Sequence, residues 1–190
     1  LEAALAGILD CYRVGRSTLL STLFRPRIDR ILFAATKADH LHHTSHDRLE
    51  AILRRIVERA AARAEVAGAA IDVVALAAVR STREAQVRCG REELPSILGT
   101  PLAGEFANDQ TFDGNTEVAT FPGDLPTDLK DLFSGNGAFR GLSTSAMDQT
   151  DFRFLRFRPP RLQGNGTGDP ALPHIRLDRA LQFLIGDRLQ

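Results

Sequence analysis

The sequence predicts an α/β protein built around a parallel sheet, and three neighbouring segments indicate this. Residues 31–35 and 71–79 are apolar runs, and residues 44–60 between them carry apolar side chains at the spacing of one helix face. A strand, a helix and a second strand within about 50 residues make a βαβ unit. The two strands of such a unit run parallel in one sheet.

Each element of this unit has its own local signals. The first strand, Ile31–Ala35, is a continuous apolar run of the kind that is buried on both faces of a sheet. Thr44 or Ser45 can cap the helix, and Gly68 suits its end. The expected buried face of the helix consists of Leu49, Ile52, Leu53, Ile56, Val57 and Ala60.

The first strand is followed by Thr36-Lys37-Ala38-Asp39, at the sheet edge where α/β proteins bind ligands. A (Asn/Thr)-Lys-X-Asp loop at this place is how P-loop GTPases recognise guanine. The Asp39 carboxylate can accept hydrogen bonds from guanine N1–H and the 2-amino group, which adenine cannot supply. Two charge-assisted bonds together contribute roughly 3–6 kcal/mol. Lys37 would lay its stem along the base, and Thr36 would tie the loop to neighbouring segments.

The alternative for this loop is an ordinary surface turn. Lys37 and Lys130 are the only lysines in a chain rich in arginine, so a generic cation here would more often be arginine. Lysine and arginine are not interchangeable where a thin stem passes under a ring. The residue choice therefore favours the guanine loop.

A second loop is expected at the same edge, after the second strand. Ala78 or Val79 would donate a backbone N–H to guanine O6, and the small side chains of Ala77 and Ala78 permit a close approach. Arg80 either covers the face of the base or is a solvated arginine.

The chain lacks the phosphate-binding motif G-x-x-x-x-G-K-(S/T). The nearest string, at residues 15–18, has no lysine. We therefore assign no catalytic residue and no metal ligand, and expect GTP or GDP with Mg²⁺ to be held through a missing N-terminal part. Since the chain begins at Leu1 and its only methionine is Met147, we expect a fragment that is inactive alone.

Overall composition excludes several classes of protein. The formal net charge is zero and the pI is about 7.2, so nothing indicates a nucleic-acid partner. No apolar run is long enough to span a membrane. Cys11 and Cys89 are too few for a disulfide scaffold, which makes a cytoplasmic location the expectation.

Four histidines, His40, His42, His43 and His46, lie just after the proposed guanine loop. Imidazoles suit a transition metal such as zinc. A loop this short cannot aim all four inward, and no cysteine or paired carboxylate completes a set. We therefore favour a histidine-lined loop and keep a metal-binding module as an alternative.

The rest of the chain divides by composition. We expect residues 1–82 to be the C-terminal half of a G domain and residues 83–150 to be an inserted subdomain of short strands and loops, including Glu117–Phe121. Residues 151–190 would return to the G domain through an amphipathic strand, Phe152–Phe157, and a closing helix. That helix begins near Asp178, ends at Gly186 and gathers Leu177, Ala180, Leu181, Leu184 and Ile185 on one face.

Three strings, at residues 23–29, 33–40 and 172–187, resemble the YcjX-like P-loop NTPase family, and the resemblance spans nearly the whole chain. It implies the C-terminal portion of a larger protein that carries the P-loop elsewhere. The expected fold is an incomplete three-layer P-loop GTPase-like parallel sheet with an inserted β-rich subdomain. The resemblance also implies a bacterial stress response, a membrane-protein partner and a position peripheral to the inner membrane.

Several functions remain open at this point, in addition to the metal-binding module. The intact protein would bind and hydrolyse GTP, although members of the family are often labelled ATPases. Alternatively, a degenerate G domain would serve as a scaffold or adaptor for a membrane partner. The Thr36–Asp39 loop favours guanine.

Overall fold

A computed structural model describes residues 7–8, 28–107, 109–123, 125, 155–160 and 172–189. The chain splits into two compact units. The first unit comprises Leu1–Ala35, Leu49–Ala75 and Arg176–Gln190, and the second comprises Thr36–Arg48 and Leu76–Ile175. Residues 15–18, the string nearest to a phosphate-binding motif, lie outside the described residues. The same holds for most of the N-terminal segment and for most of residues 124–154.

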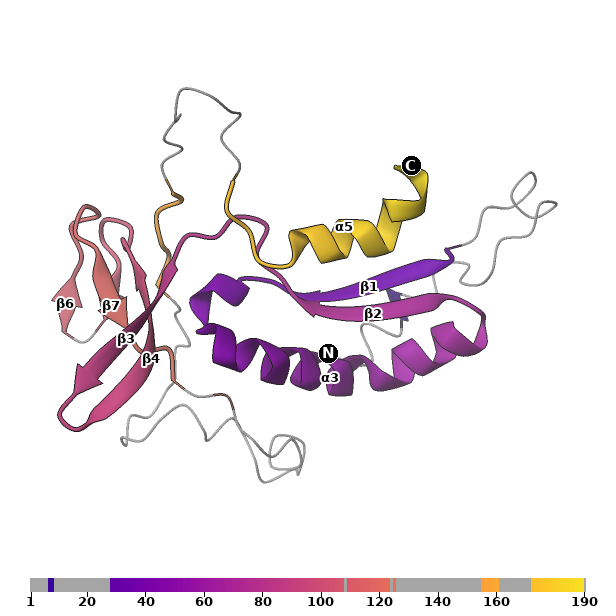
Figure 1. The fold of residues 1–190 in the computed structure, drawn as a ribbon, viewed down its shortest axis with the longest axis horizontal. Helices are drawn as coiled ribbons and strands as arrows, with labels where there is room; N and C mark the ends of the chain where they lie inside the picture. The colour runs from indigo at the N-terminus through magenta and orange to yellow at the C-terminus, as the bar shows by residue number, and fades with distance from the viewer. Residues whose placement is uncertain are drawn as a thin grey trace. The chain divides into compact units, whose positions relative to one another are not determined.

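The first unit contains the predicted βαβ arrangement. Strands β1 (Arg30–Ala35) and β2 (Ala70–Ala75) pair in parallel, with Ala35 opposite Ala75 at the end of both strands. Helix α3 (His46–Val66) connects them and lies along one face, while α5 (Leu177–Ile185) lies along the other (Figure 1). A short 3₁₀ turn, Gly186–Arg188, follows α5. The three layers and the parallel pairing confirm the predicted α/β class.

Apolar side chains of α3 and the two strands form the core of this unit. Phe33, Val57 and Val73 are buried at its centre. Partly buried Ile31, Leu53, Ile56, Ala61 and Ile71 pack around them. The core residues of α3 recur three or four positions apart, as predicted, because that spacing returns a side chain to the same face of a helix.

Charged side chains attach α5 to the strands. The Arg30 guanidinium forms a two-pronged pair with Asp187 at 2.6 and 2.8 Å, and Arg179 pairs with Asp72 at 2.7 Å. The five residues that were expected to share one apolar face of this helix are not buried alike, since Ala180 is buried while Leu181, Leu184 and Ile185 are exposed. Leu177 and Phe183 of the same helix are partly buried, so only part of its apolar surface faces solvent.

The second unit is built on antiparallel strands. β3 (Arg83–Cys89) and β4 (Glu92–Gly99) form a hairpin, and β7 (Val118–Thr120) pairs with the other edge of β4. Two-residue strands β5 (Phe106–Ala107) and β6 (Gln110–Thr111) form a separate ladder. Gly90 occupies the hairpin turn at φ 65°, where a residue without Cβ is least strained. The short strands predicted for the inserted segment are thus present in its described part.

Residues 155–158 line the core of the second unit in strand-like fashion. Leu155 and Phe157 are buried with Ile97, while Arg156 between them is exposed. The Arg158 N–H donates to Thr100 O at 2.8 Å, which adds this segment to the neighbouring chain. The described half of the predicted amphipathic strand therefore has the expected alternation, and burial makes Phe157 unavailable for stacking on a nucleic-acid base.

Within the described ranges, no helix has both the length and the apolar character needed to cross a bilayer. The described cysteine, Cys89, is an exposed thiol on β3.

The core of the first unit generates a stability prediction. Val57→Ala removes two methyl groups from a fully buried position and should lower the free energy of unfolding by about 2 kcal/mol. Val66→Ala, on the exposed end of the same helix, is the matched control and should change it by less than about 0.5 kcal/mol. Urea denaturation followed by circular dichroism measures both, and equal losses would contradict this account of the core.

Candidate functional site

The structure brings together the two loops that the sequence singled out. The first begins at Thr36 after β1, and the second begins at Leu76 after β2. The Ala38 N–H donates to Leu76 O at 3.1 Å, which joins the loops through their backbones. Since the two strands are parallel and end opposite each other, both loops leave the same edge of the sheet.

Asp39 is the centre of the contact between the loops. Its carboxylate accepts a hydrogen bond from the Ser81 N–H at 2.9 Å through Oδ2, and its backbone carbonyl accepts one from the Thr82 hydroxyl. Asp39 is only 4% exposed and Thr82 is equally buried. Ser81 and Thr82 thus fix both the backbone and the side chain of Asp39, a role that sequence reasoning did not assign to them.

One oxygen of the Asp39 carboxylate remains available. Within the described residues, no donor is bonded to Oδ1. Every side-chain nitrogen and oxygen atom there that is fully buried does have a hydrogen-bond partner, so Oδ1 cannot be fully buried. Oδ1 therefore keeps contact with solvent despite the burial of the residue. A carboxylate has about four acceptor positions, so one bond from Ser81 leaves enough for two further donors.

Lys37 holds an unusual backbone conformation. Its φ of 61° and ψ of 37° lie in the left-handed region, and it caps a 3₁₀ turn, η1 (Ala38–His40). This conformation costs a residue with a Cβ about 1 kcal/mol. Contacts elsewhere in the loop must offset this cost. One of them is the hydrogen bond that the His40 N–H donates to Lys37 O at 3.0 Å.

His46 supplies a second support for the loop. It is the first residue of α3, is buried, and places Nε2 2.9 Å from Ala38 O. The 3₁₀ turn η2 (His43–Ser45) leads into the helix directly before it. His46 is thus engaged with the loop backbone.

The predicted base-contacting residues differ in exposure. Thr36 and Lys37 are exposed on the first loop, and Ala78 and Val79 are exposed on the second. Ala77 is buried, and both its N–H and its carbonyl are bonded to Ile175. The N–H groups of Ala78 and Val79 have no partner in the described part of the chain. They are therefore the donors that this loop offers to a ligand.

Two further predicted roles can be compared with the structure. Thr36 makes no hydrogen bond to the described residues, and the loop is tied through Ala38 and Asp39 instead. The Arg80 side chain donates to Thr82 O at 3.0 Å and to the Glu84 carboxylate at 2.9 Å. Arg80 is thus half-buried and held within its own segment.

A cavity of about 880 Å³ lies beside the second loop. Ser81, Thr82, Arg83 and Arg158 are among its lining residues, but Lys37 and Asp39 are not. This cavity therefore borders Ser81 and Thr82, the residues that hold Asp39, without including Asp39 itself.

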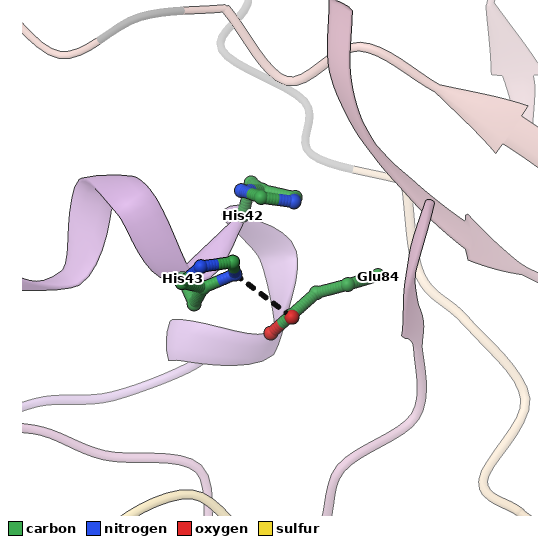
Figure 2. Close-up of side chains that lie close together, drawn as sticks. All are labelled: His42, His43 and Glu84. Carbon is green, nitrogen blue, oxygen red and sulfur yellow. Dashed lines mark ion pairs between the residues drawn. The ribbon is translucent and has the colours of Figure 1, made fainter. Parts of the chain in front are cut away.

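The four histidines serve different purposes. His40 packs edge-on against Phe157, with ring centroids 5.4 Å apart. His42 and His43 lie next to Glu84 of β3 (Figure 2), and His46 contacts Ala38. The sequence could not reveal Glu84 as a neighbour because about 40 residues separate it from the histidines.

Burial lowers the pKa of His40, and the nearby positive charge of Lys37 adds to this effect, while Asp39 opposes it. Burial also lowers the pKa of His42. The nearby His43 and His46 lower this pKa further, while the Glu84 carboxylate opposes the shift. In both imidazoles the neutral form is therefore favoured more strongly than in a free histidine.

Comparison with known protein families gives a match over residues 1–189 to the model described as "YcjX-like family, DUF463". The chain belongs to the YcjX-like family. A curated relative from Escherichia coli strain K12, named "Ras-like GTPase YcjX", is 32% identical over 190 residues. A relative of the same name from Shewanella oneidensis is 31% identical over 195 residues. These alignments cover all of this chain but only 35% and 34% of the two relatives, so the chain spans about a third of their length. Membership in this family confirms the resemblance found in the sequence.

The left-handed conformation of Lys37 generates a prediction about residue preference. Where the backbone conformation suits alanine, a protein with glycine at that position is less stable than one with alanine by about 0.4–1 kcal/mol, because glycine has more freedom in the unfolded chain. At position 37 we expect Lys37→Gly to be at least as stable as Lys37→Ala, because only the glycine relieves the positive φ. Thr36→Gly and Thr36→Ala form the matched control pair and should keep the ordinary order. Chemical denaturation measures the stability of the four variants. If Lys37→Ala is more stable than Lys37→Gly, the backbone strain at position 37 is refuted.

The lowered pKa of His40 generates a prediction about pH. A histidine whose pKa is lower in the folded state binds its proton more readily when unfolded, so folding stability falls as the pH drops below about 6.5. His40→Phe keeps an aromatic ring beside Phe157 and removes the titration, so the loss of stability between pH 7.5 and 5.5 should become smaller. Urea midpoints at both pH values measure this loss. His174→Phe, at an exposed position, is the control and should leave the loss unchanged.

Proposed function

We propose that this chain carries the guanine-reading part of a GTP-binding protein and that the intact protein hydrolyses GTP. The observation that carries the proposal is the Asp39 carboxylate, held by the Ser81 N–H of the loop that also contains the unbonded N–H groups of Ala78 and Val79. The names of the two relatives, both Ras-like GTPases, agree with it.

Recognition of the base follows from the donors and acceptors at this edge. Asp39 Oδ1 and the remaining lone pair of Oδ2 accept from guanine N1–H and the 2-amino group. The N–H of Ala78 or Val79 donates to guanine O6. Adenine carries a lone pair at N1, has no 2-amino group and bears an amino group at position 6. It would therefore leave both the carboxylate and the backbone donor without a partner.

The surrounding residues make the recognition selective because they fix Asp39 before the base arrives. Ser81 and Thr82 bond its side chain and backbone, so little conformational freedom is lost on binding. The exposed stem of Lys37 would cover one face of the base. The left-handed turn at this residue sets the direction in which the loop presents the stem.

The chemistry of hydrolysis is proposed for the intact protein as a whole. Phosphoryl transfer needs a phosphate-binding loop, Mg²⁺ ligands and a group that orients water. We assign none of these roles to a residue of this chain, which covers about a third of the length of its relatives. The contribution of this chain is the choice of base.

A competition experiment tests the proposal on the intact protein. Labelled GDP bound to the protein should be displaced by unlabelled GDP at concentrations about 100-fold or more below those of ADP, which corresponds to at least about 3 kcal/mol of discrimination. If ADP displaces the label as well as GDP does, base recognition by this loop is excluded, and an ATPase or an adaptor without nucleotide preference becomes the better account.

A substitution locates the discrimination at Asp39. Asp39→Asn presents an amide N–H where the carboxylate accepted, so it should weaken GDP binding by about 100-fold and favour xanthosine diphosphate, whose O2 replaces the 2-amino group. Asp109→Asn, at an exposed position in the second unit, is the control and should bind GDP normally. Unchanged GDP affinity in Asp39→Asn would contradict the assignment.

A further inference from the structure

The side chains of His42, His43 and Glu84 gather in the second unit, outside the guanine-reading contacts. Each offers one ligand atom, and these atoms all lie within 4.8 Å of one another. Figure 2 shows the His43 ring directed at the Glu84 carboxylate, with His42 close by. The distance from His43 Nδ1 to Glu84 Oε2 is 2.8 Å. We propose that these three residues form a binding site for a divalent transition-metal ion, with Zn²⁺ as the best-fitting ion.

The spacing of the three groups is close to that of a coordinated ion. Ligand atoms around a tetrahedral zinc lie about 3.3 Å apart, because each bond is about 2.0–2.2 Å long. The His43 Nδ1 to Glu84 Oε2 distance of 2.8 Å is slightly shorter than this value, and no two ligand atoms of the cluster are more than 4.8 Å apart. Small side-chain rotations suffice to seat the ion, since His43 and Glu84 are both partly exposed and can adjust.

Neighbouring groups already orient two of the three ligands. The Nδ1 atom of buried His42 lies 3.0 Å from the Thr44 hydroxyl, which fixes the ring. The Arg80 guanidinium donates to Glu84 Oε1 at 2.9 Å and leaves Oε2 to face the histidines. Metal-binding histidines and carboxylates are ordinarily held in this way by a second hydrogen bond, which raises affinity by restricting their orientation.

The donor set selects the class of ion. Two imidazoles and one carboxylate suit zinc and similar transition metals, with water completing the coordination. Mg²⁺ and Ca²⁺ prefer oxygen ligands alone and would bind this set poorly. Binding also requires unprotonated imidazole, so affinity for the ion should weaken as the pH falls.

The position of the cluster gives the ion a structural consequence. His42 follows Asp39 closely on the first loop, and Glu84 follows Thr82 closely on the second segment. A metal bridging them would join the same two segments that hold Asp39, and so would restrain the loop independently of any nucleotide.

Isothermal titration of the untagged intact protein with Zn²⁺, and separately with Mg²⁺, tests the site. We expect one Zn²⁺ site that Mg²⁺ does not occupy, and a rise in melting temperature with Zn²⁺ alone. His43→Ala and Glu84→Gln should each weaken Zn²⁺ binding at least tenfold. His174→Ala, which removes an exposed histidine outside the cluster, should leave binding unchanged.

Two outcomes of the same titrations would contradict the proposed metal site. Zn²⁺ affinity that is unchanged in both His43→Ala and Glu84→Gln, or that falls equally in His174→Ala, places any bound zinc elsewhere on the surface. Far-UV circular dichroism confirms that the variants are folded. Because both substituted side chains are partly exposed, the folded state should survive the change.

Discussion

The hydrogen bond from the Ser81 N–H to the Asp39 carboxylate is the interaction on which the site depends. It joins two segments that are about 40 residues apart in the chain, and the Thr82 hydroxyl strengthens the junction at the backbone of the same aspartate. A buried carboxylate needs such partners, because an unpaired charge away from water is strongly unfavourable. The bond therefore satisfies Asp39 and, at the same time, fixes the direction of its second oxygen.

The parallel pairing of β1 and β2 explains why these two segments meet. In a βαβ unit the chain returns to the same edge after each strand, and the register here places Ala35 opposite Ala75. The helix that makes this return possible is held by an apolar core centred on Val57 and Val73. A simple pattern of apolar residues thus brings polar residues together at one place.

Local sequence patterns predicted the strands, the helix and the Thr36–Asp39 loop, because each depends on neighbours within a few residues. Contacts over long separations were beyond such patterns. The periodicity of the sequence could not show that Ile175 would form hydrogen bonds with both the N–H and the carbonyl of Ala77. Nor could it show that Glu84 would pair with His43. Likewise, the apolar residues of α5 have helical spacing, yet Leu181, Leu184 and Ile185 are exposed while the ion pairs of Arg30 and Arg179 join this end of the chain to the strands.

The exposed apolar side chains of α5 lead us to expect self-association of the chain in concentrated solution. Leu181, Leu184 and Ile185 are 38–45% exposed and occur at the three- and four-residue intervals that make one continuous stripe on a helix. Exposed apolar patches of this kind promote self-association when no partner covers them. Production of the isolated chain is therefore best monitored by light scattering, with polar replacements on this stripe as the first remedy for aggregation.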